Sequence, residues 1–169
     1  MTPPRSMARL WAPWRSRFIY QRGARGCIFC RAVKSRADRR HYVFARSRRA
    51  FSLLNLYPYN NGHVMVAPRR HVADLRHCGD EELLELWRLT AQVQHQLARV
   101  LTPHGFNLGL NIGRVGGAGI PGHLHVHIVP RWRGDTNFMP VLAGTKVISE
   151  SLDDLYRRLT ANRSPRRQP

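Results

Sequence analysis

The sequence predicts an α+β domain that combines an antiparallel sheet of about five strands with one long and one short helix. Three observations support this fold class. The length of 169 residues suits one domain better than two. Five short segments have the apolar or alternating pattern of strands, mostly in antiparallel order, and two amphipathic segments predict helices segregated to one side of them.

The expected strands are short, and each has an apolar or alternating pattern. They cover residues 42–46, 50–55, 62–68, 106–113 and 123–129. In the fourth segment the residues at every second position are apolar, so Phe106, Leu108, Leu110 and Ile112 are expected on one face. Pro130 is expected to end the last strand.

The long helix is expected to follow Gly79. Asp80 can cap its start, and the acidic residues of the first turn interact favourably with the positive end of the helix dipole. Helical spacing is then shared by Leu83, Leu86, Trp87, Ala91, Gln94, Leu97 and Leu101, until Pro103 forbids continuation. Trp87 is expected in the core or in a subunit contact. A shorter helix is expected to begin near Ser149 or Ser151 and to run through 152–160.

The chain divides into three parts. Residues 1–26 are expected to form an extended arm, 27–160 a single domain and 161–169 a disordered basic tail. No apolar run reaches the length of about 20 residues that a membrane span needs, and the first ten residues lack the apolar core of a signal peptide. These features predict a soluble cytoplasmic protein without a membrane partner.

The charge is strongly basic, with 28 Lys and Arg against 10 Asp and Glu. Such an excess fits either a solvated surface or a phosphate-rich partner, because clustered arginines attract polyanions. A basic nucleic-acid-binding protein is therefore the alternative of another class, although it is not the favoured one.

The stretch "HLHVHIV", residues 123–129, carries the strongest chemical signal. Side chains alternate along a strand, so His123, His125 and His127 emerge on one face while Leu124, Val126 and Ile128 point to the other. Stacked imidazoles repel one another when protonated, and a strand that only needed polarity would more readily use Thr or Ser. The pattern indicates a site in which one imidazole is a nucleophile and others donate to an anion or bind a metal.

Two further features lie near this chemistry. The segment 111–122 is rich in glycine, which lets the backbone approach a ligand and offer N–H groups to phosphate oxygens. Cys27 and Cys30 have the spacing of half a zinc site, and Cys78 is one candidate for a further ligand. Two buried thiols packed as small apolar residues are the alternative.

At these residues the chain resembles the histidine-triad (HIT) superfamily of nucleotide hydrolases and transferases. The resemblance rests on "HLHVHIV" and extends over roughly residues 10–160 through "LWAPWR", "CIFC", "NLYPYNNGHVMVAPRRH" and "GDTNFMP". These segments are similar to the bacterial branch that includes diadenosine tetraphosphate phosphorylases. The resemblance implies a HIT-like fold and a homodimer or higher homo-oligomer.

The resemblance also assigns roles to individual residues. His125 would attack the α-phosphate and form a covalent nucleotidyl-imidazole, while His127 and His63 would donate hydrogen bonds to the phosphate. Asn55 would contact the ribose. The phosphate-binding loop would consist of Asn111, Ala118 and Gly119, where Gly119 lacks the hydroxyl that some relatives carry. A structural zinc would be held by Cys27, Cys30, His71 and His123, with no organic cofactor.

The acceptor of the second step determines the reaction. Inorganic phosphate gives phosphorolysis, water gives hydrolysis and a sugar phosphate gives a nucleotidyltransferase, and all three pass through the same intermediate. The favoured prediction is phosphorolysis of diadenosine tetraphosphate to ADP and ATP. The alternatives are a hydrolase of dinucleoside polyphosphates or nucleoside phosphoramidates, and a nucleotidyltransferase.

Overall fold

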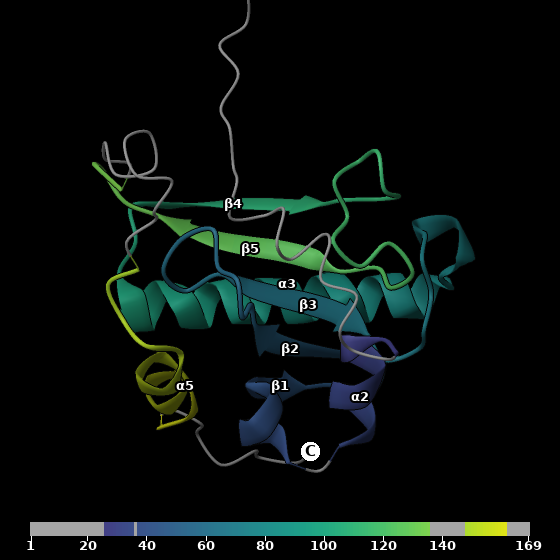
Figure 1. The fold of residues 1–169 in the computed structure, drawn as a ribbon, viewed down its shortest axis with the longest axis horizontal. Helices are drawn as coiled ribbons and strands as arrows, with labels where there is room; N and C mark the ends of the chain where they lie inside the picture. The colour runs from purple at the N-terminus through teal and green to yellow at the C-terminus, as the bar shows by residue number, and fades with distance from the viewer. Residues whose placement is uncertain (1–25, 36, 136–147, 162–169) are drawn as a thin grey trace, which may run out of the picture.

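The computed structural model describes residues 26–35, 37–135 and 148–161, and it contains a five-stranded antiparallel sheet (Figure 1). The strands are β1 (Val43–Arg46), β2 (Ala50–Leu54), β3 (Val64–Pro68), β4 (Gly105–Leu110) and β5 (Val126–Arg131). Their order across the sheet is β1-β2-β3-β5-β4. The predicted α+β class and the antiparallel sheet are confirmed. The N-terminal arm and the basic tail lie outside the described residues, apart from Gly26 and Ala161.

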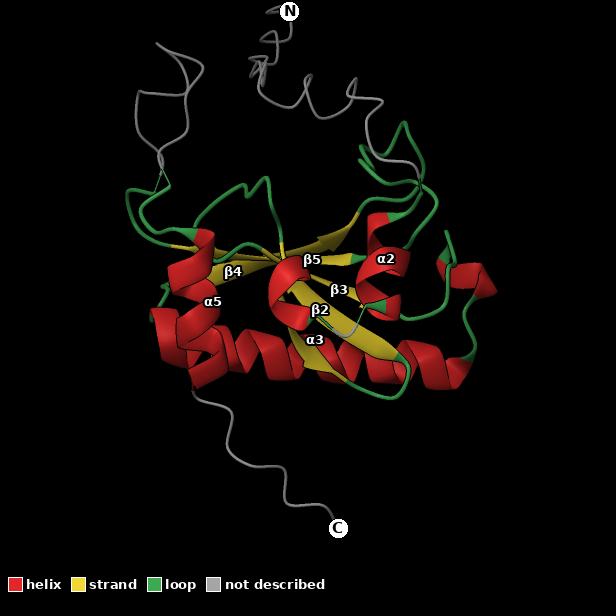
Figure 2. Cartoon of the chain, turned by 60° about the horizontal axis from the view of Figure 1, so that its bottom comes forward, coloured by secondary structure: helices red, strands yellow, loops and turns green. Residues whose placement is uncertain are grey.

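The helices cover both faces of this sheet. The long helix α3 (Asp80–Leu101) lies along one face, together with α5 (Leu152–Ala161), whereas the short α2 (Ile28–Lys34) lies on the other face (Figure 2). Two 3₁₀ turns, η1 (Asp38–His41) and η2 (Leu75–His77), connect these elements. None of the helices in the described part of the chain is long and apolar enough to cross a membrane.

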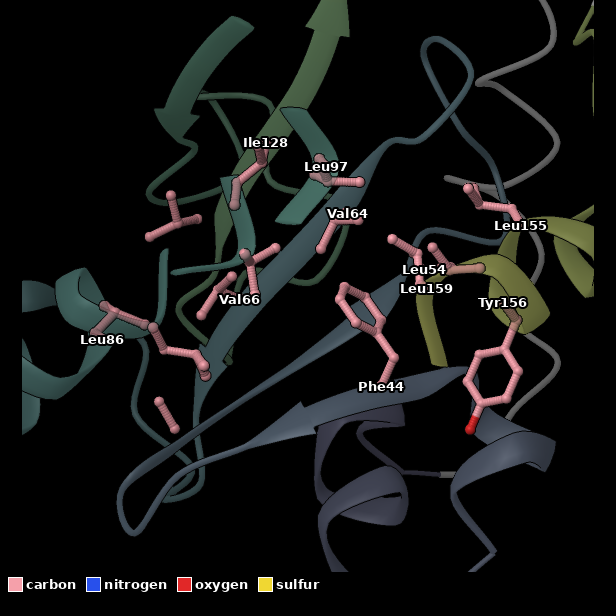
Figure 3. Packing of buried hydrophobic residues seen from close by; sticks show 14 of the residues in the cluster. Phe44, Leu54, Val64, Val66, Leu86, Leu97, Ile128, Leu155, Tyr156 and Leu159 are labelled. Atoms are coloured by element: carbon pink, nitrogen blue, oxygen red, sulfur yellow. The ribbon is translucent and has the colours of Figure 1, made fainter. Parts of the chain in front are cut away.

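The larger core lies between the sheet and α3 with α5. Leu54, Val64, Val66 and Ile128 of the sheet form one cluster with Leu97 of α3 and Leu159 of α5 (Figure 3). The smaller core lies under α2 and is centred on Phe29 and Phe51. Burying apolar side chains of this size contributes about 1.5–3 kcal/mol each, so the two cores fix the sheet from both sides.

Two sequence predictions for α3 require correction. The N-cap is Gly79 rather than Asp80, and its amide donates to Oε2 of Glu82 at 3.1 Å. The buried face consists of Leu86, Leu89, Thr90, Val93, Leu97 and Leu101. Trp87 is 45% exposed, so it is not a core residue of this chain. The predicted apolar face mixed buried and exposed residues of α3, because several apolar residues of this helix are exposed.

The predicted end of the last strand is also wrong. β5 continues through Pro130, which pairs with Phe106, as far as Arg131. The carbonyl oxygen of Pro130 accepts from Nδ2 of Asn60 at 3.0 Å. In a strand, the N–H of a residue points to the same side as its carbonyl. The N–H that Pro130 lacks would therefore point toward Asn60 and away from β4. Because the β3–β5 ladder ends at Val64 and Ile128, no hydrogen bond of the sheet is lost there.

The edge strand and the short N-terminal helix differ from expectation as well. β4 ends at Leu110, and Leu108 is 46% exposed because α3 packs on β2, β3 and β5. The helix α2 was not predicted. It has seven residues, and neither a side-chain cap nor a first-turn acid marks its start among the described residues. The predicted short C-terminal helix is confirmed as α5, which ends at Ala161 in the expected tail.

Candidate active site

The histidine run approaches and enters β5 with the predicted alternation. Leu124, Val126 and Ile128 lie in the larger core. The three imidazoles face the other side and are themselves buried, since His123, His125 and His127 are 1%, 3% and 9% exposed. Only His127 lies within the strand, where it pairs with Met65 and Gly109. The histidine face is therefore a protein interior with a defined set of neighbours.

The hydrogen bond of His125 fixes its tautomer. Its Nδ1 lies 2.7 Å from the carbonyl oxygen of His123, and a carbonyl can only accept. Nδ1 therefore carries the proton, and Nε2 keeps its lone pair. Burial lowers the pKa of His125, which favours the neutral imidazole. Both effects favour the form of the ring that can act as a nucleophile.

His63 and His127 form a hydrogen-bonded pair whose direction is set by the backbone. The amide of Tyr59 donates to Nδ1 of His63 at 3.0 Å, so the proton of a neutral His63 lies on Nε2. This Nε2 is 2.9 Å from Nδ1 of His127 and donates to it. The proton of a neutral His127 then lies on its Nε2. These two hydrogen bonds therefore make Nε2 of His127 a hydrogen-bond donor.

Direct donation by His63 to a phosphate stays a prediction. In the structure the Nε2–H of His63 is directed at Nδ1 of His127, so His63 can also act on a phosphate through His127. Asn55 lies beside His63, with 3.3 Å between its Nδ2 and Nδ1 of His63, and its Oδ1 accepts from the amide of Tyr57 at 3.0 Å. The predicted site residues Asn55, His63 and His127 are thus neighbours.

The glycine-rich segment forms a loop before the histidine run. Asn111 donates through Nδ2 to the carbonyl oxygen of Gly117 at 3.4 Å. The amide of Ala118, which was predicted to face a phosphate, donates to the carbonyl oxygen of Gly113 at 3.2 Å. Gly119 is exposed. Phosphate binding by this loop remains a prediction, and the inward hydrogen bond of Ala118 leaves Gly119 as the stronger amide candidate.

The structure brings together a cluster of four potential metal ligands, Cys27, Cys30, His71 and His123, whose donor atoms lie within 4.8 Å of one another. Sγ of Cys27 is 3.3 Å from Nδ1 of His123, and Sγ of Cys30 is 3.2 Å from Nδ1 of His71. Tetrahedral zinc, with Zn–S bonds of about 2.3 Å and Zn–N bonds of about 2.0–2.1 Å, separates neighbouring ligand atoms by about 3.3–3.8 Å. The donor set and its spacing fit such an ion. Cys78 is not part of the cluster.

The surroundings of His123 also suit a metal ligand. Its Nε2 donates to the carbonyl oxygen of Pro68 at 2.9 Å, which leaves Nδ1 deprotonated and directed toward the two cysteines. Such an outer hydrogen bond orients many metal-bound histidines. Burial, the largest cause, lowers the pKa of His123 to about 4, so the ring is neutral over the physiological range.

Sequence reasoning missed the residues that support these histidines. The ring of Tyr59 lies 4.4 Å from that of His63 and 5.6 Å from that of His127. Asn60 accepts from the amide of His63 at 3.2 Å and donates through Nδ2 to Asp135 at 2.8 Å. Asn60 lies three residues before His63, but Asp135 lies 72 positions after it. Only the fold reveals this contact.

The fold and the site together define a histidine-triad protein, in which three alternating histidines lie on one face of a central strand. The family profile described as the HIT domain matches residues 37–134, more than half of the chain. The chain therefore belongs to the HIT family. Cys27 and Cys30 precede the matched segment, so the metal-ligand cluster joins an N-terminal extension to the family domain.

Comparisons with known proteins agree with this assignment. The chain is 38% identical over 161 residues to the AP-4-A phosphorylase of Mycobacterium tuberculosis, covering 90% of this chain and 83% of that protein. It is 36% identical over 93 residues, 55% of this chain and 50% of that protein, to the asymmetrical bis(5'-nucleosyl)-tetraphosphatase of Schizosaccharomyces pombe. A zinc-bound histidine triad family protein from Mycobacterium smegmatis aligns with a TM-score of 0.61 at 26% identity, covering 82% of this chain and 94% of that one.

Proposed function

We propose that the protein is a phosphorylase of dinucleoside polyphosphates, with diadenosine tetraphosphate as substrate and inorganic phosphate as acceptor. The observation that carries this proposal is the buried, neutral His125, whose Nδ1 is bound to a backbone carbonyl and whose Nε2 keeps its lone pair. The similarity to a phosphorylase over most of both chains supports the choice of reaction.

The reaction proceeds in two displacements at one phosphorus atom. Nε2 of His125 attacks the α-phosphorus of the substrate, the P–N bond forms, and the bond to the bridging oxygen breaks so that ATP leaves. An oxygen of inorganic phosphate then attacks the same phosphorus. The P–N bond breaks, ADP leaves, and His125 regains its lone pair for the next cycle.

His127 stabilises the charge that develops during these steps. Its Nε2–H is the donor that the bond from His63 to Nδ1 of His127 enforces. A donor placed before the reaction needs no reorganisation when negative charge grows on the phosphate oxygens. Asn55, Asn111, Ala118 and Gly119 are proposed to bind the ribose and the phosphates.

Hydrolysis is the alternative within the same site. If water rather than phosphate attacks the intermediate, the products are AMP and ATP. The similarity to a tetraphosphatase, although over a shorter segment, supports keeping this alternative. Cleavage of nucleoside phosphoramidates or transfer to a sugar phosphate would use the same first step, with a different leaving group or acceptor.

We further propose that the four-ligand cluster holds a structural zinc ion. The spacing of the sulfur and nitrogen atoms and the outer hydrogen bond of His123 support this. With four protein ligands the ion would be closed to substrate, so zinc would contribute folding free energy rather than Lewis acidity. Thiol ligands need reducing conditions, which supports a cytoplasmic location.

We propose a homodimer formed through β4. In the described part of the chain this strand pairs only with β5, so its other edge is unpaired, and the side chain of Leu108 on this strand is exposed. An unpaired edge with exposed apolar side chains is a template for pairing with a second strand. Light scattering after gel filtration tests this, since Leu108→Arg should shift a dimer to monomer.

Product analysis tests the reaction. The protein is incubated with diadenosine tetraphosphate, with and without inorganic phosphate, and the nucleotides are separated. ADP and ATP formed only with phosphate support phosphorolysis, whereas AMP and ATP formed without phosphate mean hydrolysis. No turnover under either condition would overturn the proposed substrate. Salt-sensitive binding of nucleic acid that His125→Ala leaves unchanged, without any turnover, would support the nucleic-acid-binding alternative.

A further inference from the structure

The turn that carries the two cysteines also carries a buried aromatic ring. Cys27 is the N-cap of α2, Cys30 lies in its first turn, and Phe29 between them is fully buried. We propose that Phe29 is a positioning residue for His125, holding the nucleophilic imidazole in the orientation that attack requires. This inference rests on the proposed nucleophilic role of His125.

Phe29 contacts both inner histidines of the run. Its ring centroid lies 4.9 Å from that of His123 and 4.9 Å from that of His125, at interplanar angles of 40° and 37°. Phe51 of β2 meets the same ring edge to face at 6.3 Å. The phenyl group is therefore fixed by the sheet and lies against the ring that the mechanism uses.

The helix that presents Phe29 is anchored at both ends, so the ring cannot easily withdraw. At its start, Sγ of Cys27 lies 3.3 Å from Nδ1 of His123. At its end, the guanidinium of Arg46 donates to the carbonyl oxygens of Ala32 at 2.8 Å and of Val33 at 3.3 Å. Asp38 holds this guanidinium through a 2.7 Å ion pair. Through these contacts, β1 and the turn with the two cysteines hold Phe29 in place.

The imidazole of His125 needs this support. The 2.7 Å bond from Nδ1 to the carbonyl of His123 fixes one atom of the ring, but the plane can still pivot about that bond. Contact with the phenyl group restricts the pivot, because interior side chains are close-packed. Nε2 must be in line with the bond that breaks, and misplacement by about 1 Å can slow a reaction roughly 100-fold. Phe29 does this by contact alone, without donating or accepting a proton.

The test compares Phe29→Leu with a matched control in the other core. Phe44 is equally buried, at 1% exposure, but it belongs to the cluster on the opposite face of the sheet. Phe44→Leu therefore removes the same atoms without touching the histidines. For both variants we measure kcat, KM, metal content and Tm, and we record ¹⁵N–¹H spectra of the histidine rings.

Phe29→Leu should lower kcat about 10- to 100-fold, with KM and metal content close to wild type. The ring signals of His125 should broaden. Phe44→Leu should show a similar loss of Tm but wild-type kcat. If Phe29→Leu and Phe44→Leu have the same kcat and His125 keeps the wild-type spectrum, the proposal is overturned.

Two further readouts keep the outcome decisive. If Phe29→Leu loses its metal, Phe29→Met retains more of the side-chain volume and replaces it. In the wild-type protein itself, the ring signals of His125 must be sharp, and signals already broadened by ring motion would contradict the proposal without any variant. If instead His125→Ala turns over normally, the proposed function has failed, and the spectra still decide whether Phe29 orders the ring.

Discussion

Substituting Gly62 by alanine tests how tightly the loop before His63 is packed. Gly62 has φ +74°, and an added Cβ would lie 2.4 Å from Cδ1 of Leu101 and 3.0 Å from Cγ of Pro130. The left-handed backbone costs an L-residue about 1–2 kcal/mol, and overpacking adds about 1–3 kcal/mol. The reduced entropy of the unfolded chain offsets about 0.4–1 kcal/mol. We expect Gly62→Ala to lose about 1–5 kcal/mol of unfolding free energy.

A matched variant separates the two contributions. Gly113 has φ +73° but nothing within 4 Å of an added Cβ, so Gly113→Ala carries the backbone strain alone, about 1 kcal/mol after the offset. Both variants are unfolded in urea with metal held constant. Gly62→Ala should also lower turnover, because His63 follows it directly. Equal losses of stability in the two variants would refute the close packing of Gly62 against α3 and β5.

Three other perturbations follow from the site. His63→Ala removes the donor to Nδ1 of His127 and should lower kcat by about 100-fold; a change confined to KM would contradict the relay. Chelation of the metal should lower Tm and zinc should restore it, whereas a Tm insensitive to chelator would argue against a bound ion. The Arg70 guanidinium, with the amide of Gly79, holds the pKa of Glu82 below its usual range. Its stabilisation is therefore present above the pKa of an unfolded glutamate, about 4.3, and is lost as pH falls through the lower folded value. The stability difference between wild type and Glu82→Gln should disappear in acid, and a difference independent of pH would contradict this linkage.

Much of the site could be predicted because its signals are local in sequence. The alternation of His123, His125 and His127 has the period of a strand, and the buried face opposite the imidazoles follows from the same period. The spacing of Cys27 and Cys30 indicated half of a zinc site, and the family resemblance added His71 and His123. The fold brings these two histidines beside the cysteines. A pattern that lies within a single strand or turn can be recognised from the sequence before the fold is known.

The missed features depend on contacts between distant segments. The helix α2 has no capping signal. It is held by contacts of its own Phe29 and Cys30 with other elements, and by the Arg46 guanidinium of β1. The exposure of Trp87 depends on where the sheet ends beneath α3, which periodicity cannot give. The contact between Asn60 and Asp135 requires β5 and the loop before β3 to meet. Tertiary packing overrides local pattern in each case.

The proposed mechanism requires a covalent nucleotidyl-histidine, which mass spectrometry can detect. The protein is mixed with diadenosine tetraphosphate in the absence of inorganic phosphate, quenched within one turnover and digested under conditions that preserve phosphoramidates. We predict one adenylyl group on the peptide containing His125, its loss with release of ADP when phosphate is added before quenching, and its absence in His125→Ala. An adduct on another residue, or turnover by His125→Ala at the wild-type rate, would contradict nucleophilic attack by His125.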